Sequence, residues 1–253
     1  MVLGTFEAAL GIVVTAGLAL GAVAARALTP IAGVVAAAFG AAIVVLVGYP
    51  FLAMLILFVV ASVLATRYHI QEKQRKNVQE GTAGERGISN VVAHIVLPTG
   101  LAIAGGWVPP VLSTPSLAVL YASALAFGAA DTFASELGVL AGSARSILTW
   151  RPVPPGTNGG VSAIGEAWAL VGGGLTAIVG LALFRLFGTP VPNAAVFLGT
   201  VAGAGFLGCQ VDSLLGETLE NRGYLTKGST NFLGMLSSIA IAAGVLLAAG
   251  VAL

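Results

Sequence analysis

The chain has 253 residues, of which 57% are hydrophobic and 8% charged, and its mean hydropathy is +1.00. A soluble domain carries about 25% charged residues, so this composition excludes a soluble globular protein. The 11 basic residues are too few for tracking nucleic acid through phosphate neutralisation. The single cysteine, Cys209, excludes an intrachain disulfide and a cysteine-based metal site.

The predicted elements are apolar stretches, each long enough to cross a ~30 Å hydrocarbon core as a helix. In chain order they lie at about 5–25, 30–48, 50–66, 91–107, 115–131, 162–184, 193–210 and 231–252. This pattern predicts an all-α, polytopic transmembrane bundle of eight helices. A count of seven stays open, because the fourth and fifth stretches are short and Pro98 interrupts the fourth.

The loops alternate between charged and nearly neutral. Long charged loops lie at 67–90, 132–161 and 211–230, so with eight spans ten of the eleven basic residues share one side. These ten are Arg26, Arg67, Lys73, Arg75, Lys76, Arg86, Arg145, Arg151, Arg222 and Lys227. By the positive-inside rule this side is cytoplasmic, which predicts a cell-membrane protein with its polar site facing the cytoplasm.

An internal duplication places two acidic motifs on that side. The segments AADTFASELG (129–138) and QVDSLLGETLE (210–220) align without gaps at an offset of 81 residues. Both copies would run inward, turn and run outward, which is a parallel repeat. Inverted-repeat transporters instead place their sites near the midplane. We therefore expect a single domain, 1–253, made of N-terminal spans (1–66), a basic loop (67–90), a first repeat (115–184) and a second repeat (193–252).

The aligned acids are candidate catalytic and metal-binding residues. Asp131 matches Asp212, and Glu136 matches Glu217. Acids at the end of a span should face the bundle interior or a wet cavity, and hard carboxylate oxygens suit Mg²⁺. An Asp and a Glu five residues apart sit about 140° apart on a continuous helix, so both can face one ion only if the helix breaks. The alternative is interhelical ion pairs with Arg145 or Arg222.

Each charged loop re-enters the membrane through a polar segment: GERGISNVV (84–92), PGTNGGVS (155–162) and TKGSTNFLG (226–234). Such residues cap helix N-termini, and several N-termini with nearby cations also make an anion cradle. The two roles stay open for each segment. The candidate nucleotide- and phosphate-binding residues are Arg86, Asn90, Arg145, Arg151, Thr157, Asn158, Gly159, Gly160, Ser162, Lys227, Ser229, Thr230 and Asn231.

These motifs carry a family resemblance over about residues 30–250. ADTFASELG, RPVPPGTNGGVS (151–162), DSLLG (212–216) and GERGISNV resemble the signatures of the integral-membrane family that contains plant and cyanobacterial phytyl-phosphate kinase. The pattern is more distantly similar to CTP-dependent polyprenol and dolichol kinases. His94 and Glu166 depart from it, which bears on the substrate more than on the chemistry.

The resemblance implies a membrane-embedded, Mg²⁺-dependent kinase. It would transfer a phosphoryl group from CTP, or another nucleoside triphosphate, to an isoprenyl monophosphate such as phytyl or geranylgeranyl phosphate. The expected partners are the nucleotide, the isoprenyl phosphate and membrane lipid, with no nucleic acid and with a homodimer left open. A prenol kinase or a cytidylyltransferase of a lipid phosphate is the alternative enzyme, and an ion-coupled transporter is the alternative from another class.

Overall fold

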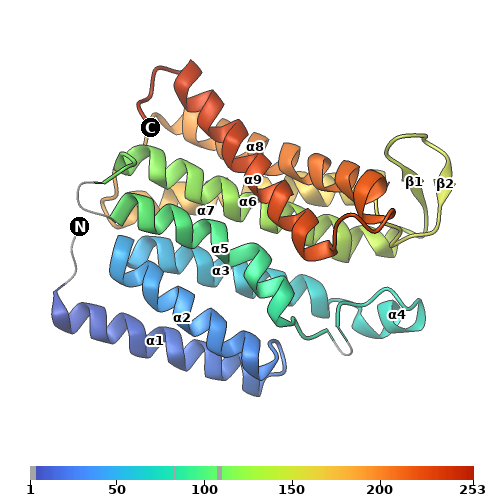
Figure 1. Ribbon diagram of the computed structural model, residues 1–253, viewed down its shortest axis with the longest axis horizontal. Helices are drawn as coiled ribbons and strands as arrows, with labels where there is room; N and C mark the ends of the chain where they lie inside the picture. The colour runs from blue at the N-terminus through green and yellow to red at the C-terminus, as the bar shows by residue number, and fades with distance from the viewer. Residues whose placement is uncertain (1–3, 82–83, 107–109) are drawn as a thin grey trace.

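The computed structural model describes residues 4–81, 84–106 and 110–253, and its helices run in one bundle (Figure 1). Eight helices in this part of the chain are long and apolar enough to span a membrane, which confirms the all-α polytopic fold and the count of eight. They are α1 (Thr5–Ala24), α2 (Pro30–Val47), α3 (Tyr49–Arg67), α5 (Ile88–Gly106), α6 (Thr114–Gly138), α7 (Ala163–Leu186), α8 (Ala194–Leu215) and α9 (Lys227–Ala248).

Shorter elements gather at one end of the bundle. Helix α4 (Ile70–Arg75) and the strands lie at the end opposite the two chain termini (Figure 1). Strands β1 (Ala144–Ser146), β2 (Pro152–Val153) and β3 (Gly160–Val161) form a small antiparallel sheet in the order β2-β1-β3. The sheet was not predicted from the sequence. It shapes the loop between α6 and α7, which carries the glycine-rich segment.

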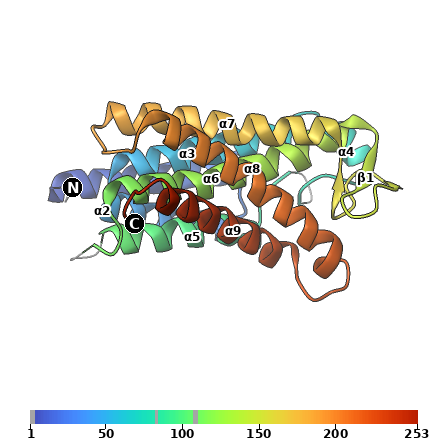
Figure 2. The same ribbon diagram turned by 90° about the horizontal axis from the view of Figure 1, so that it is seen from above.

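Helix α6 forms the centre of the bundle. It runs between α7 on one side and α5 and α9 on the other (Figure 2), and it is the most buried of the eight spanning helices. Small residues permit this packing: a Cβ at Gly205 would lie 2.7 Å from Ala126 Cβ, and one at Gly172 would lie 2.6 Å from Ala129 O. Close helix contacts at small residues are typical of membrane bundles.

Pro98 does not interrupt α5, since the helix continues through it to Gly106. At the charged end, however, the helices extend further than hydropathy predicts. Helix α6 continues past Asp131 to Gly138, and α9 begins at Lys227 rather than near 231. The charged motifs therefore lie on the helices themselves, where the helix axis fixes the direction of each side chain.

Candidate functional site

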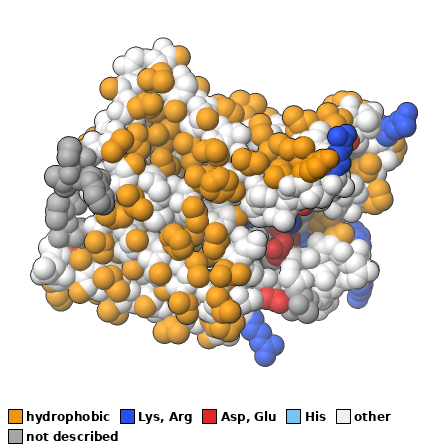
Figure 3. All heavy atoms as spheres, viewed as in Figure 1, with side chains coloured by type: hydrophobic (Ala, Val, Ile, Leu, Met, Phe, Trp, Pro, Cys, Tyr) orange, Lys and Arg blue, Asp and Glu red, His pale blue; other side chains and the backbone are white. Residues whose placement is uncertain are grey.

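A polar cavity of about 150 Å³ opens at the charged end of the bundle. Helices α6, α7, α8 and α9 contribute to its wall, together with the loop between α6 and α7. Its polar lining residues are Asp131, Ser135, Thr157, Asn158, Ser162, Glu166, Asp212, Ser213, Glu220, Lys227 and Asn231. Figure 3 shows acidic and basic side chains gathered in a hollow at this end, while hydrophobic side chains cover most of the rest of the visible face.

The two duplicated aspartates line this one cavity. Asp131 comes from α6 and Asp212 from α8, and the two carboxylates interact electrostatically. The amide nitrogen of Asn231, in the orientation that satisfies its neighbours, donates to Asp212 Oδ1 at 3.3 Å. Lys227 also acts electrostatically on both aspartates. The repeat thus brings its matching acids to one site.

The matching glutamates lie elsewhere. Helix α6 is continuous through Glu136, so Glu136 points away from Asp131, as the helix geometry requires. It accepts hydrogen bonds from Lys73 Nζ at 2.7 Å and from Thr66 Oγ1 at 3.0 Å. Glu136 is 7% exposed and Lys73 is fully buried. The structure therefore pairs Glu136 with α3 and α4 rather than with the cavity.

Glu217 lies in a π-helical turn, η2 (Gly216–Glu220), which follows α8. It accepts hydrogen bonds from Ser146 Oγ at 2.5 Å and from the Leu148 amide at 3.2 Å, which attach the β1 hairpin to α8. The same turn brings Glu220 into the cavity lining, where it accepts from Asn158 Nδ2 at 3.0 Å. π turns often occur at functional sites. This one leaves Glu220, rather than Glu217, in the cavity wall.

The four predicted carboxylates therefore do not form one cluster. Across residues 4–81, 84–106 and 110–253, no group of three or more His, Cys, Asp or Glu side chains is placed to hold a metal ion. The alternative ion pairs, with Arg145 or Arg222, are also missing from the ion pairs of these residues. The acids that line the cavity are the two aspartates together with Glu166 and Glu220.

The glycine-rich segment lines the cavity as a loop. Thr157, Asn158, Gly159, Gly160 and Ser162 all contribute to the wall. Gly159 has φ +75°, and a Cβ there would lie 2.4 Å from Glu217 Cβ, so only glycine fits. The α7 cap is Ser162, whose Oγ accepts from the Gly165 amide at 3.0 Å. Asn158 is thus free of a capping role.

At the start of α9, too, the residues that cap the helix differ from those that line the cavity. Thr226 is the N-cap and exchanges hydrogen bonds with Ser229, while Thr230 Oγ1 donates to the Thr226 carbonyl. Lys227 and Asn231 line the cavity, and neither Ser229 nor Thr230 does. Of the predicted phosphate-binding residues in this segment, the structure brings Lys227 and Asn231 to the acids.

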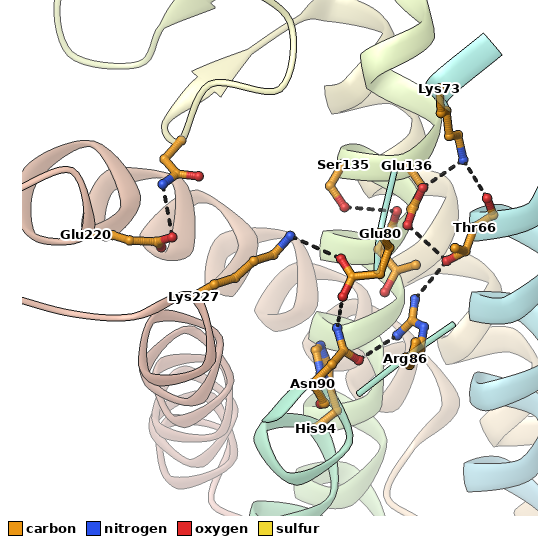
Figure 4. A network of polar contacts seen from close by, with 12 residues as sticks. Thr66, Lys73, Glu80, Arg86, Asn90, His94, Ser135, Glu136, Glu220 and Lys227 are labelled. Carbon is orange, nitrogen blue, oxygen red and sulfur yellow. Dashed lines mark hydrogen bonds and ion pairs between the residues drawn. The ribbon is translucent and has the colours of Figure 1, made fainter. Parts of the chain in front are cut away.

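Arg86 and Asn90 belong to a neighbouring network rather than to the cavity wall (Figure 4). Arg86 donates to Thr66 Oγ1 at 3.2 Å and to Asn90 Oδ1 at 3.1 Å. Asn90 donates to Glu80 Oε1 at 3.2 Å, and Glu80 pairs with Lys227 at 3.5 Å. This chain of contacts connects Glu136 on α6 to Lys227 on α9.

Burial lowers the pKa of Arg86, and the carboxylates of Glu80, Glu136 and Asp131 oppose that shift. The backbone of Arg86 is held by the turn after α1: its amide donates to the Ala27 carbonyl at 3.0 Å, and its carbonyl accepts from the Thr29 amide at 3.2 Å. The Arg86 backbone is thus fixed, and its guanidinium interacts electrostatically with Asp131 of the cavity wall. Arg145 and Arg151 are exposed on the β hairpin and do not line the cavity.

Several functional candidates escaped the sequence analysis. Lys73, Glu80 and Glu220 each contact a predicted site residue. Lys73 and Glu80 lie in a basic loop without a recognisable motif, and Glu220 has no acidic counterpart in the first copy of the repeat. On a regular helix, the spacing of eight residues would put Asp212 and Glu220 about 80° apart. The sequence therefore carries no clear signal for Glu220, and it is the π turn that brings this residue to the cavity.

Comparison with known proteins identifies relatives across kingdoms. Residues 13–249 match the family described as "Integral membrane protein DUF92". The chain is 30% identical to the uncharacterized membrane protein MJ0933 of Methanocaldococcus jannaschii over 75% of this chain and 73% of the relative. It is 30% identical to Protein PGR of Arabidopsis thaliana (70% and 67%) and 32% identical to the uncharacterized membrane protein sll0875 of Synechocystis (77% and 73%). No solved structure matches.

Proposed function

The chain belongs to the DUF92 family of integral membrane proteins, and from that premise we propose that it is a membrane-embedded, Mg²⁺-dependent kinase. It transfers a phosphoryl group from a nucleoside triphosphate, with CTP favoured, to an isoprenyl monophosphate such as phytyl or geranylgeranyl phosphate. One observation carries the proposal. Both copies of a duplicated motif contribute an aspartate to one polar cavity, beside a glycine loop and a lysine.

The aspartate pair fits Mg²⁺. This ion usually binds through one or two carboxylates and completes its shell with water and substrate phosphates, rather than in an all-protein cage. Asp131 and Asp212 provide two carboxylates in one cavity, which matches that ligand set. When bound, the ion would neutralise charge on the nucleotide phosphates. Two acids in a buried, low-dielectric site also favour a cation.

The chain's other cavity residues suit a polyphosphate. Lys227 offers a point charge, Asn158 offers an amide, and Gly159 and Gly160 allow close approach of the loop backbone. Phosphoryl transfer asks mainly for positioning and charge neutralisation. An acceptor that is already a phosphate needs no strong general base. One of its oxygens attacks the γ-phosphorus, the bond from that phosphorus to the β-phosphate oxygen breaks, and the nucleoside diphosphate leaves.

The polar site lies at the membrane end that carries the basic loops, so a water-soluble nucleotide meets a lipid-borne acceptor there. By the positive-inside rule this end faces the cytoplasm. The hydrogen bonds of Glu136 and Glu217 give both residues positioning roles. Glu136 fixes α6 against α3 and α4, and Glu217 fixes the glycine loop through the β1 hairpin.

The test is transfer by the purified chain, incubated with Mg²⁺, labelled CTP or ATP, and C15 to C20 isoprenyl phosphates. The proposal predicts a lipid diphosphate and a nucleoside diphosphate as products. Asp212→Asn should abolish transfer, while Glu72→Gln, at an exposed side chain of α4, should leave it intact as a matched acid control. Release of inorganic diphosphate, with the nucleoside monophosphate joined to the lipid, would instead identify a nucleotidyltransferase. Product from free prenol alone would identify a prenol kinase.

A further inference from the structure

Three residues that each carry a buried, unpartnered polar atom line a second, smaller cavity. It measures about 50 Å³, and α2, α3 and α5 supply most of its wall. Ser62 Oγ, Arg86 Nε and His94 Nε2 belong to its lining residues, and none of the three atoms has a hydrogen-bond partner among the described residues. Ser62 is 1% exposed, His94 4% and Arg86 7%. Buried polar atoms normally have partners, so three orphans around one space indicate a binding site.

The three atoms form a defined donor and acceptor set. His94 Nδ1 lies 2.9 Å from the Asn90 carbonyl, which can only accept, so Nδ1 carries the proton and Nε2 keeps its lone pair. The terminal nitrogens of Arg86 donate to Thr66 and Asn90, which leaves Nε–H as a free donor. The Ser62 hydroxyl can donate or accept. The site therefore suits a small head group that both accepts and donates, and the Arg86 charge favours an anion.

The remainder of the cavity is hydrocarbon. Leu55, Phe58, Val59, Val91 and Ile95 complete much of the lining, and all lie on membrane-spanning helices. The space is several times the roughly 10–15 Å³ that one water needs, yet it is too small for a long chain. A ligand here would have a polar head between the three atoms and an apolar chain directed along the helices.

The cavity also lies next to the aspartate site. A Cβ at Gly128, three residues before Asp131 on α6, would lie 2.8 Å from Phe58 Cε2 and 3.1 Å from His94 Cδ2. Arg86 and Asp131 interact electrostatically. Figure 4 shows His94 and Arg86 beside Asn90, at the lower end of the network that leads to Lys227. A head group in this cavity would therefore lie close to the part of α6 that carries Asp131.

We propose that this cavity is the seat of the lipid acceptor's head group, a phosphate monoester on an apolar chain, and this inference rests on the proposed kinase function. Arg86 Nε and Ser62 Oγ donate to phosphate oxygens, and the singly protonated phosphate donates to His94 Nε2. A second groove, between α3, α6 and α7, is larger at about 260 Å³ but is lined almost wholly by apolar residues. It offers no comparable group for a phosphate.

The binding test uses the full chain in nanodiscs without nucleotide or Mg²⁺, and geranylgeranyl monophosphate carrying a diazirine as the probe. On the wild-type chain, we expect cross-links to the cavity residues Val59, Val91 or Ile95. Ser62→Ala and Arg86→Lys should each weaken probe binding about tenfold, the effect of losing one net hydrogen bond. Ser123→Ala is the matched control, because Ser123 Oγ is also buried and unpartnered but lies outside the cavity; it should bind like the wild type.

Three results would overturn the inference: cross-links confined to the α7 side of the other groove, at Leu175 or Val179; unchanged binding by Ser62→Ala; or equal competition by geranylgeraniol. The cross-linking experiment uses the wild-type chain, so its result does not depend on whether a variant folds.

A transfer assay separates this inference from the proposed function. Transfer with an unchanged KM for the lipid in Ser62→Ala overturns the head-group seat alone. Weakened lipid-phosphate binding without any transfer overturns the kinase and leaves the seat.

Discussion

The ion pair between Lys73 and Glu136 provides the sharpest test of how the site is supported. Lys73 Nζ donates to Glu136 Oε2 at 2.7 Å, to the Ala65 carbonyl at 2.8 Å and to the Thr66 carbonyl at 3.0 Å, and the lysine is fully buried. Lys73→Met would leave the Glu136 carboxylate buried with Thr66 as its remaining donor. Breaking a buried pair at one partner costs about 3–5 kcal/mol.

For a chain of this size, each kcal/mol corresponds to about 2–4 °C, so Lys73→Met should lower the Tm by roughly 6–20 °C. The assay is thermal unfolding in detergent at one scan rate. The double variant Lys73→Met/Glu136→Gln should recover much of the loss, because it removes the uncompensated charge. Lys76→Met is the control on the same helix: it breaks the exposed pair with Glu72 and should leave the Tm unchanged.

Two results would refute this reasoning. In the first, Lys73→Met is no more destabilising than Lys76→Met, and the buried pair then does not support the fold. Alternatively, Glu136→Gln could abolish phosphoryl transfer with the Tm unchanged. Glu136 would then act on the substrate, as the sequence motif suggested, and its contact with Lys73 would be incidental.

Three further predictions follow from the loop and the topology. Gly159→Ala should reduce transfer at least tenfold because its Cβ would meet Glu217, whereas Gly174→Ala, whose Cβ meets nothing within 4 Å, should have no effect; equal activities would contradict the close-packed loop. Glu217→Gln should weaken the hairpin attachment by about 1–3 kcal/mol and speed limited proteolysis within 142–159, and an unchanged cleavage rate would contradict that attachment. In a Cys209→Ala background, Arg145→Cys should react with an impermeant maleimide only from the cytoplasmic side and Leu186→Cys only from the other; the reverse pattern would contradict the orientation.

The sequence predicted the spans well because hydropathy over some twenty residues is a strong signal. Hydropathy predicts the ends of the helices poorly where those ends carry charged residues. Asp131 and Asp212 lower the local hydropathy, so the predicted helices stopped near them, although both helices continue through the acids. On a continuous helix, Asp131 and Glu136 must face different directions. Because α6 is continuous through both residues, they do so in the structure.

The remaining differences come from features without a local sequence signal. The π turn after α8 exchanges Glu217 for Glu220 at the cavity, and a regular alignment of the two repeats cannot show such a change of register. Ser62 lies within an apolar span, and only the folded chain places it in the same cavity wall as His94 on α5 and Arg86 before α5. Long-range packing decides both cases.

The most direct test of the central claim is a double-mutant cycle on phosphoryl transfer. The rate constants are measured for the wild type, Asp131→Asn, Asp212→Asn and the double variant, with saturating Mg²⁺, CTP and geranylgeranyl phosphate. If both aspartates serve one ion and one polyphosphate, each single variant loses most of the activity and the double variant loses little more. Full activity in either single variant, or losses that multiply as for independent sites, would contradict a shared site.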